Sequence, residues 1–463
     1  MNDEETLPGL RDAVDAGLPT AIADLSNLVR IPSVAWDGFD FAHVDASAEA
    51  VRALFEQTGV FGLVDIRRAP QEGTDVLGRP AVIATRAARN GKPTILLYAH
   101  HDVQPPGDDA GWDSLPYEPT VRGDRLYGRG AADDKAGVIS HVAAIRALVE
   151  TIGADNLDLG LAVFIEGEEE FGSRSFKNFL LENKADLAAD VMVVADSGNW
   201  DTETPALTVA LRGNVTFKLR VTTLAHASHS GMLGGAVPDA MLAAIRLLAT
   251  LHDENGSVAV AGLVSHVAPT PEYTEQTLRA ESGLLDGVSM IGTGSILDRL
   301  WYQPALTITG IDAPTVQNAS NTLVPSVTVK VSMRLAPGQD PTAAYEALSK
   351  HLHDNAPFGA QLEISDLDKG SPFLVDTSGW AVAEATDAML EAWQKPAVHV
   401  GAGGSIPFIA DLAEIFPDAQ VLVTGVEDPD SRAHSPNESL HLGVFRRGIL
   451  SEAILLAKLN SRT

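Results

Sequence analysis

The chain has 463 residues, of which 45% are hydrophobic and 21% charged, and its formal net charge is −29. This length exceeds what a single hydrophobic core normally organises, so we expect two domains. The strong negative charge disfavours nucleic acids and anionic membrane surfaces as partners. Because the chain has no cysteine, disulfides, iron–sulfur clusters, thiolate nucleophiles and cysteine-based zinc sites are excluded. Any bound metal must therefore have nitrogen and oxygen ligands.

The first five residues, MNDEE, are acidic, whereas a signal peptide begins with basic residues. No later apolar run reaches the length of a membrane span. We therefore expect a cytoplasmic enzyme, with no membrane partner, that acts on a small molecule or a peptide.

Apolar runs alternate with helical patterns between about residues 81 and 196. The runs at residues 94–98 and 161–165 are continuous, as in strands buried on both faces, and residues 137–150 follow a helical period. The pattern predicts an α/β domain with a mostly parallel sheet.

A second pattern begins near Leu207. Residues 327–334 alternate strictly, as in a strand with one wet face, and residues 238–252 have the period of an amphipathic helix. After Trp380, a helical pattern precedes the buried-strand run at residues 420–423. We therefore predict that an α+β domain at residues 206–380 is inserted into a catalytic domain formed by residues 1–205 and 381–463.

Polar side chains follow several of the predicted strands. His100 and Asp102 come directly after the run at residues 94–98, at the end of a strand where α/β sheets bind ligands. Asp133 and Asp134 precede the helix predicted at residues 137–150. The alternative for these pairs is that they only cap a loop and a helix.

The segment at residues 166–170, EGEEE, places four carboxylates after another buried strand. Such a cluster repels itself unless cations neutralise it, although an exposed acidic helix start is the alternative. Asp196 ends a further apolar run, and His434 lies in a loop after the strand at residues 420–423. Together these positions suggest a two-metal hydrolase.

The combination of motifs resembles a known family. The segments at residues 100–105 (HHDVQP), 111–113 (GWD) and 127–135 (YGRGAADDK) are similar to those of co-catalytic metallopeptidases. That family includes carnosinase-type dipeptidases, aminoacylases, glutamate carboxypeptidase and succinyl-diaminopimelate desuccinylase. The branch with cytosolic carnosinase-like dipeptidases is the most similar, and the resemblance extends from His100 to His434.

The resemblance implies an α/β, mostly parallel-sheet di-metal catalytic domain with an inserted lid and dimerisation domain. It also implies two divalent metal ions held by five ligands. Zinc is the first choice, with manganese or cobalt as alternatives. The implied ligands are His100 and Asp196 for one metal, Glu170 and His434 for the other, and Asp133 as the bridge, with a cis bond between Asp133 and Asp134.

Two further residues receive catalytic roles from the resemblance. Asp102 would orient His100. Glu169 would be the general base, which takes a proton from the water between the metals and passes it to the leaving amine. The register within the acidic run depends on the following Gly172-Ser173 pair, and a slip of one residue would make Glu168 the base.

Four residues would bind substrate by the same resemblance. His229 would stabilise the oxyanion in the active site of a neighbouring subunit, which implies a homodimer formed through the lid domains. Arg334 and Ser405 would hold the terminal carboxylate of the substrate, and Thr322 would be a further lid contact. Ala402 departs from the family, because carnosinase-like relatives have glutamate there.

Three functions are therefore compared. The first is a metallo-dipeptidase, or a carboxypeptidase, that hydrolyses an amide bond in dipeptides or short peptides with a free C-terminal carboxylate. The second is an N-acyl amino acid deacylase with the same di-metal centre. The third is a catalytically silent binding protein, which the presence of all five ligands and of Glu169 disfavours.

Overall fold

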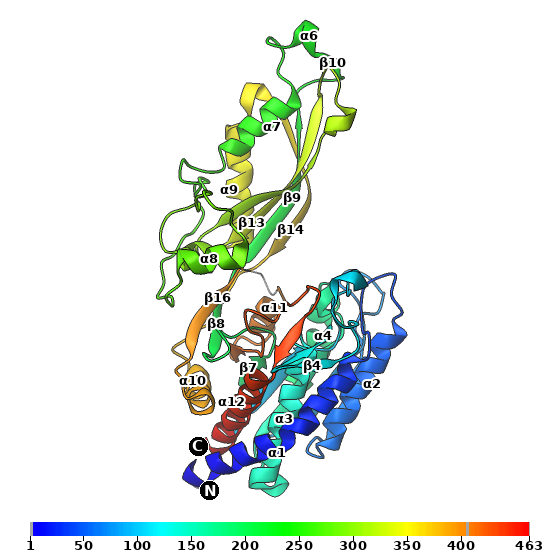
Figure 1. The fold of residues 1–463 in the computed structure, drawn as a ribbon, viewed down its shortest axis with the longest axis vertical. Helices are drawn as coiled ribbons and strands as arrows, with labels where there is room; N and C mark the ends of the chain where they lie inside the picture. Colours follow the sequence, from blue (N-terminus) through cyan, green and yellow to red (C-terminus); the bar gives the residue numbers. More distant parts are fainter. Residues whose placement is uncertain (1–2, 404–406, 463) are drawn as a thin grey trace. The chain divides into compact units, whose positions relative to one another are not determined.

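The computed structural model of the chain describes residues 3–403 and 407–462 (Figure 1). The chain divides into two compact units. Unit 1 comprises Met1–Val209, Val375–Val400 and Asp411–Thr463, and unit 2 comprises Ala210–Leu374 and Gly401–Ala410. Within the described part of the chain, no helix is both long enough and apolar enough to cross a membrane.

The main sheet has nine strands in the order β1-β2-β6-β3-β7-β17-β8-β15, and β16 pairs with β8. Its four central strands, β6, β3, β7 and β17, run parallel to one another, whereas β1, β2, β8 and β15 pair antiparallel. The parallel sheet that the apolar runs predict is therefore its centre, within a sheet that is mixed overall. The strands are β1 (Leu63–Arg67), β2 (Ala81–Arg86), β3 (Thr94–His100), β6 (Gly160–Glu166), β7 (Val191–Val194), β8 (Ala206–Leu211), β15 (Phe373–Leu374), β16 (Val398–Ala402) and β17 (Gln420–Val423).

Long helices pack together in unit 1. Helix α3 contacts both α1 and α12, and α12 also contacts α10. Figure 1 shows α1, α3 and α12 running alongside one another. The helices of this unit are α1 (Asp3–Val29), α2 (Ala42–Gln57), α3 (Lys135–Ile152), α4 (Phe176–Glu182), α5 (Lys184–Leu187), α10 (Trp380–Trp393) and α12 (Leu442–Ser461), while α11 (Pro407–Ile415) begins in unit 2 and ends in unit 1.

A small antiparallel sheet, in the order β18-β5-β4, completes unit 1. Its strands are β4 (Thr120–Arg122), β5 (Arg125–Tyr127) and β18 (Ser439–His441). Short 3-10 helices lie at Asp109–Gly111, Ala154–Asn156 and Glu169–Phe171. The pairing of β18 with β5 brings residues that follow His434 beside residues that precede Asp133.

Unit 2 is built on an antiparallel sheet in the order β11-β13-β9-β14. Strand β13 (Ser326–Leu335) alternates between half-buried and buried residues over its whole length, which confirms the predicted strand with one wet face. The other strands are β9 (Gly213–Thr222), β11 (Ala305–Asp312) and β14 (Gln361–Gly370), with β10 (Ser228–His229) and β12 (Thr322–Leu323) forming a separate pair.

Helices α7 (Ala240–Ala249) and α9 (Pro341–Asp354) pack on this sheet. The amphipathic helix predicted at residues 238–252 is confirmed as α7, and it begins where the Asp239 carboxylate accepts the Leu242 N–H at 2.7 Å. The remaining helices are α6 (Ser230–Leu233), α8 (Glu275–Ser282), a π-helix at Asp298–Tyr302, and 3-10 turns at Val316–Asn318 and Pro357–Gly359.

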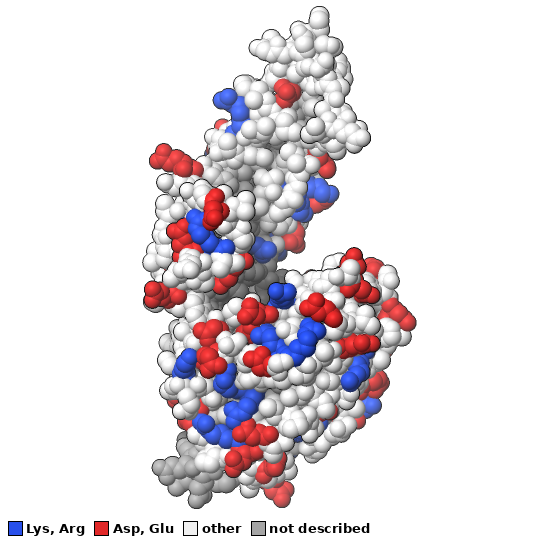
Figure 2. Space-filling view, in the orientation of Figure 1, with Lys and Arg blue, Asp and Glu red and all other residues white. Residues whose placement is uncertain are grey.

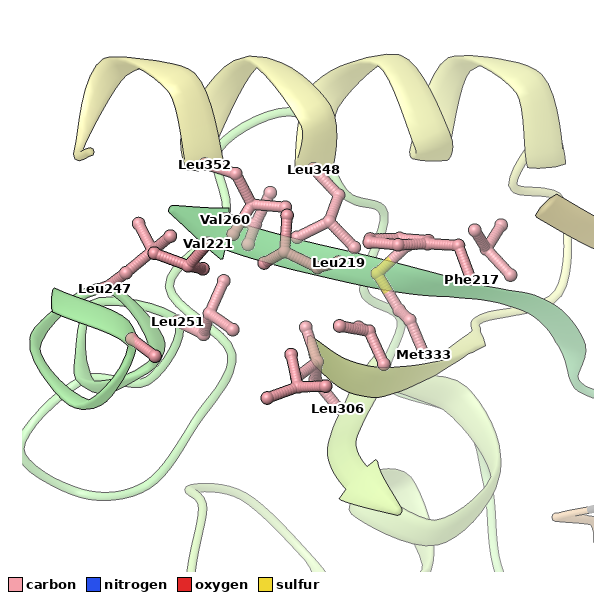
Figure 3. Close-up of a cluster of buried hydrophobic side chains, with 14 of the residues drawn as sticks. Phe217, Leu219, Val221, Leu247, Leu251, Val260, Leu306, Met333, Leu348 and Leu352 are labelled. Carbon is pink, nitrogen blue, oxygen red and sulfur yellow. The ribbon is translucent and has the colours of Figure 1, made fainter. Parts of the chain in front are cut away.

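The core of unit 2 lies between its helices and the apolar face of the sheet (Figure 3). Phe217 and Leu219 on β9 meet Leu348 of α9, and Leu247 of α7 joins them from the other helix. The period of two along the strands and the i, i+4 spacing along α9 place all these side chains on the buried face.

Candidate metal centre

The candidate ligands follow neighbouring strands of the main sheet. Strand β3 ends at His100, β7 ends two residues before Asp196, and β6 ends four residues before Glu170. Because β6, β3 and β7 are adjacent and parallel, their carboxyl ends lie at one edge of the sheet. This order brings together side chains that are far apart in the sequence.

His100 is fully buried and contacts two aspartates. Its Nδ1 lies 3.1 Å from the carbonyl oxygen and 3.4 Å from Oδ1 of Asp102, and its Nε2 lies 3.1 Å from Oδ1 of Asp133. Burial opposes the charged form, but these carboxylates raise the pKa of His100 well above its ordinary value. Asp102 therefore orients the imidazole so that Nε2 faces Asp133.

Asp133 lies between two histidines. While its Oδ1 faces His100, its Oδ2 lies 3.0 Å from Nε2 of His434, which is also 3.2 Å from Oε2 of Glu170. Hydrogen bonds with Asp133 and Glu170 raise the pKa of His434 to about 11. A carboxylate with one oxygen toward each histidine has the geometry that a bridging ligand needs.

The five predicted ligands, together with Asp134, fall into two compact groups of potential donor atoms. One contains His100, Asp134 and Asp196, and the other contains Asp133, Glu170 and His434; within each group the donor atoms lie within 4.8 Å of one another. The first group thus contains Asp134, whereas the residue predicted to bridge both metals is Asp133. We favour Asp133 as the bridge, because an oxygen of Asp134 accepts the backbone N–H of His100 at 3.1 Å.

Asp134 precedes helix α3 but does not cap it, since its side chain makes no capping hydrogen bond. The capping alternative is therefore wrong for this residue. The bond between Asp133 and Asp134 is cis. Gly137, in the first turn of α3, leaves the space that Asp134 occupies, because a Cβ there would lie 2.2 Å from its Oδ1.

The acidic run at residues 166–170 is not an exposed helix start, because Glu166, Glu168 and Glu170 are buried. Glu168 accepts hydrogen bonds from the backbone N–H of Arg79 and from the N–H and hydroxyl of Ser175. Both of its oxygens are therefore used to hold neighbouring segments of the chain in place. Glu169 has a side chain 20% exposed, with Oε2 4.0 Å from Nε2 of His100.

Asp102 also holds the acidic run in place. Its two oxygens accept the backbone N–H groups of Glu169 and Glu170 at 3.1 and 3.0 Å. The same carboxylate thus positions His100 and the two successive glutamates. This arrangement supports Glu169, rather than Glu168, as the carboxylate that faces the centre.

The electrostatics of the centre fit divalent cations. Burial raises the pKa of Asp196 to about 7, and burial with neighbouring negative charge raises the pKa of Glu169 well above its ordinary value. Among the residues described, no lysine or arginine forms a salt bridge with Asp133, Glu170 or Asp196. Carboxylates and imidazoles without such partners form a nitrogen and oxygen donor set that suits metal ions.

Comparison with known proteins identifies the family. The model of the family described as "Peptidase family M20/M25/M40" matches residues 96–457 of this chain. The chain belongs to this peptidase family. The predicted resemblance to co-catalytic metallopeptidases is therefore confirmed.

Individual relatives of this M20 peptidase cover nearly the whole chain. A cysteinylglycine-S-conjugate dipeptidase of Corynebacterium striatum is 34% identical over 89% of this chain and 90% of the relative. A Cys-Gly metallodipeptidase of Schizosaccharomyces pombe is 28% identical over 96% of each chain. The fold is shared with the di-peptidase Dug1p of Saccharomyces cerevisiae, at a TM-score of 0.77 and 23% identity, over 98% of each chain. Human carnosine dipeptidase 1 has a TM-score of 0.75 at 24% identity, also over 98% of each chain.

The predicted substrate-binding residues of the M20 chain lie mainly in unit 2. His229 and Thr322 are exposed and pair with each other across β10 and β12. Arg334 lies half-buried on β13. Burial, and after it the charge of Arg334, lowers the pKa of Arg212 to about 10. Ser405 lies outside the described residues.

Some residues near the centre are missed by sequence reasoning. Glu438 is fully buried and accepts the backbone N–H of Asp133 at 3.1 Å. Glu427, whose N–H donates to Ser197 near Asp196, has a pKa raised well above its ordinary value by burial and by neighbouring carboxylates. Glu427 lies four residues after the end of β17, as Glu170 lies four residues after the end of β6, so its position after a buried strand was a signal that could have found it. No such local pattern indicates Glu438. His101, in contrast, is buried, with its Nε2 2.9 Å from the carbonyl oxygen of Pro80.

Proposed function

We propose that this M20 peptidase is a di-metal dipeptidase that hydrolyses the amide bond of dipeptides or short peptides with a free C-terminal carboxylate. The observation that carries the proposal is the position of Asp133 between His100 and His434, with Glu169 beside His100. The names of the relatives support the substrate class, because they include Cys-Gly and β-Ala-His dipeptidases.

Five side chains of the proposed centre would hold the metal ions needed for hydrolysis. Asp133, with His100 and Asp196 on one side and Glu170 and His434 on the other, would hold two divalent cations. When bound, such cations polarise a carbonyl and acidify water.

Glu169 would move the proton. Its Oε2 lies 4.0 Å from Nε2 of His100, beside the candidate ligands, where its carboxylate would accept a proton from water and then deliver that proton to the leaving amine. Asp102 fixes the Glu169 backbone and so limits where its carboxylate can reach.

Arg334 would bind the carboxylate of the substrate. Burial is the main cause and the charge of Arg334 the second cause of the lowered pKa of Arg212, so unit 2 holds two cations that repel each other. An anionic group between or beside them relieves their repulsion, and a guanidinium grips a carboxylate bidentately.

We further propose zinc as the metal and a homodimer as the active form. Imidazole and carboxylate ligands accept zinc, manganese and cobalt, and zinc binds such sites more tightly than manganese. Unit 2 exposes apolar side chains on α6, α7 and the turn at 316–318, including Met232, Ile245 and Val316. Around α6, at the top of Figure 2, no charged side chain is visible, as suits a face that binds a second copy. The cytoplasmic location remains a prediction.

Substrate assays with metal analysis test the function. We expect the purified protein to contain about two zinc ions per chain. It should cleave Cys-Gly, its S-conjugates or β-Ala-His, and it should leave their N-acetylated forms intact. Cleavage of N-acetyl amino acids without cleavage of free dipeptides would instead establish the deacylase alternative. The structure offers that alternative the same metal ligands, so only the substrates separate the two.

A further inference from the structure

Glu438 is a buried carboxylate beside the candidate metal centre, and it is not one of the candidate metal ligands. It lies four residues after His434, and its side chain is fully buried. Its Oε1 accepts the N–H groups of Ala132 and Asp133 at 2.9 and 3.1 Å, and its Oε2 accepts the N–H of Gly130 at 3.1 Å. One side chain thus binds the loop that ends at the bridging Asp133.

The fourth hydrogen bond to Glu438 comes from Arg129, whose Nη1 lies 2.7 Å from Oε2. The two oxygens of a carboxylate offer about four acceptor sites, and here four donors occupy them. Arg129 is itself 1% exposed, so the pair is shielded from water and is held by hydrogen bonds as well as by charge.

Arg129 extends the same network to two further loops. Its Nη2 reaches the carbonyl oxygens of Pro105 and Ser435 at 3.5 and 3.4 Å. Pro105 lies in the segment that follows His100, and Ser435 follows His434 directly. The pair therefore connects the three segments that carry His100, Asp133 and His434.

We propose that Glu438, paired with Arg129, is a positioning residue that fixes the Asp133 loop against the His434 loop and so sets the geometry in which metal ions bind. The inference rests on the metal centre proposed above. Since Glu438 binds the backbone of Asp133, its loss would let the bridging carboxylate shift relative to His434. Within the described part of the chain, the side-chain hydrogen bonds of Glu438 go to Arg129 and to backbone N–H groups, and none goes to a candidate ligand side chain.

The variant Glu438→Gln tests this role with little change in volume. Glutamine has one acceptor oxygen, and its NH₂ group would face N–H donors on one side of the network. We expect the variant to bind Co²⁺ about 10- to 100-fold more weakly, as when groups that orient metal ligands are removed. The visible absorption of the bound Co²⁺ should also change, because its ligand geometry does. Glu438→Asp, which keeps the charge but is too short to reach all four donors, should show the same direction of change.

Asp428→Asn is the matched control. Asp428 is buried and pairs in unit 1 with Arg125, at 2.8 Å, and among the described residues none of its hydrogen bonds involves a candidate ligand. We expect this control to lose thermal stability while its Co²⁺ affinity and spectrum remain those of the unaltered protein. Equal effects of Asp428→Asn and Glu438→Gln on the spectrum would overturn the positioning role, as would Co²⁺ binding by both Glu438 variants like that of the unaltered protein. Failure of the unaltered protein to bind Co²⁺ would overturn the metal centre itself.

Discussion

His229 and Thr322 stand directly opposite each other, as a register pair of the two-stranded sheet β10–β12. Both side chains are exposed, and Nδ1 of His229 accepts the N–H of Gly231 at 3.0 Å, so the hydrogen of a neutral imidazole resides on Nε2. The ring is thereby prepared to donate a hydrogen bond from Nε2. Two residues that the family resemblance assigns to the lid thus lie side by side on the exposed surface of unit 2.

The first prediction concerns this donor. His229→Ala should lower kcat about 100- to 1,000-fold, as the loss of one oxyanion donor does, with a smaller effect on KM. Steady-state kinetics on a cleaved dipeptide measure the change. His226→Ala is the control, because His226 lies three residues away, is also exposed and has its Nδ1 3.0 Å from the carbonyl oxygen of Ala227.

Mixed dimers test whether His229 acts across an interface. Subunits with His229→Ala, combined with subunits carrying Glu169→Gln, should recover activity, because one site of each mixed dimer then has both residues. If His229 acted within its own chain, mixing would restore nothing.

The second prediction separates the glutamates of the acidic run. Glu169→Gln should reduce kcat about 100- to 10,000-fold at unchanged metal content, because the general base is lost. Glu168→Gln should mainly lower stability, by about 1–3 kcal/mol, since a buried hydrogen-bond network with Arg79 and Ser175 loses an acceptor. If Glu169→Gln kept full activity while Glu168→Gln was folded but inactive, the general base would be Glu168 instead.

Much of this centre could be predicted from the sequence because its ligands follow buried strands. The apolar runs before His100, Glu170 and Asp196 are continuous, and parallel strands bring their carboxyl ends together. The antiparallel edges were not predicted. Strand β1 is only half-buried throughout, and β15 has two residues, so neither shows a clear pattern.

The roles of Glu438 and Glu168 could not be read from the sequence for a different reason. Each depends on backbone N–H groups that converge from distant segments, such as Ala132 with Glu438 or Arg79 with Glu168. Residue type and spacing do not encode such convergence. The capping alternative for Asp134 was open for the same reason, since only the fold places its oxygen against the N–H of His100.

The third prediction concerns metal removal. Chelation should abolish activity and lower the melting temperature, because the buried carboxylates of the centre then repel one another. At a free metal concentration about 100 times Kd, binding stabilises the folded state by about 2.7 kcal/mol. Calorimetry with and without chelator measures the shift, and re-addition of zinc should reverse it. An unchanged melting temperature after verified loss of metal would contradict the assigned ligands.

The fourth prediction concerns carboxylate recognition by Arg334. Arg334→Lys should raise KM about 10- to 100-fold for free dipeptides, which corresponds to the 1.5–3 kcal/mol of a hydrogen bond to a charged group. For dipeptides whose terminal carboxylate is amidated, the variant and the unaltered protein should differ little. Arg220→Lys is the control on the neighbouring strand β9, where the arginine is exposed and bonds to Ser326. An equal rise in KM for both kinds of substrate would exclude a specific grip on the carboxylate.

The fifth prediction is a pH dependence of stability that arises away from the metal ligands. His141 is fully buried, with Nδ1 2.8 Å from Oε1 of Glu452 and Nε2 3.1 Å from the carbonyl oxygen of Tyr98, so both nitrogens face acceptors. Burial opposes the charged form, but the charge and hydrogen bond of Glu452 raise the pKa of His141 above its ordinary value of 6.5. A raised folded-state pKa means that its stabilising contribution is complete below pH 6.5 and is lost as the pH rises through the folded-state pKa.

The variant His141→Gln should therefore be less stable than the unaltered protein at acidic pH, and the difference should shrink as the pH rises. Melting temperatures of both proteins, measured at matched pH values, give this difference and cancel the titration of the metal ligands. His353→Gln, which alters an exposed histidine of α9, should show no such trend. A difference that grows with pH would mean that His141 is neutral in the folded protein.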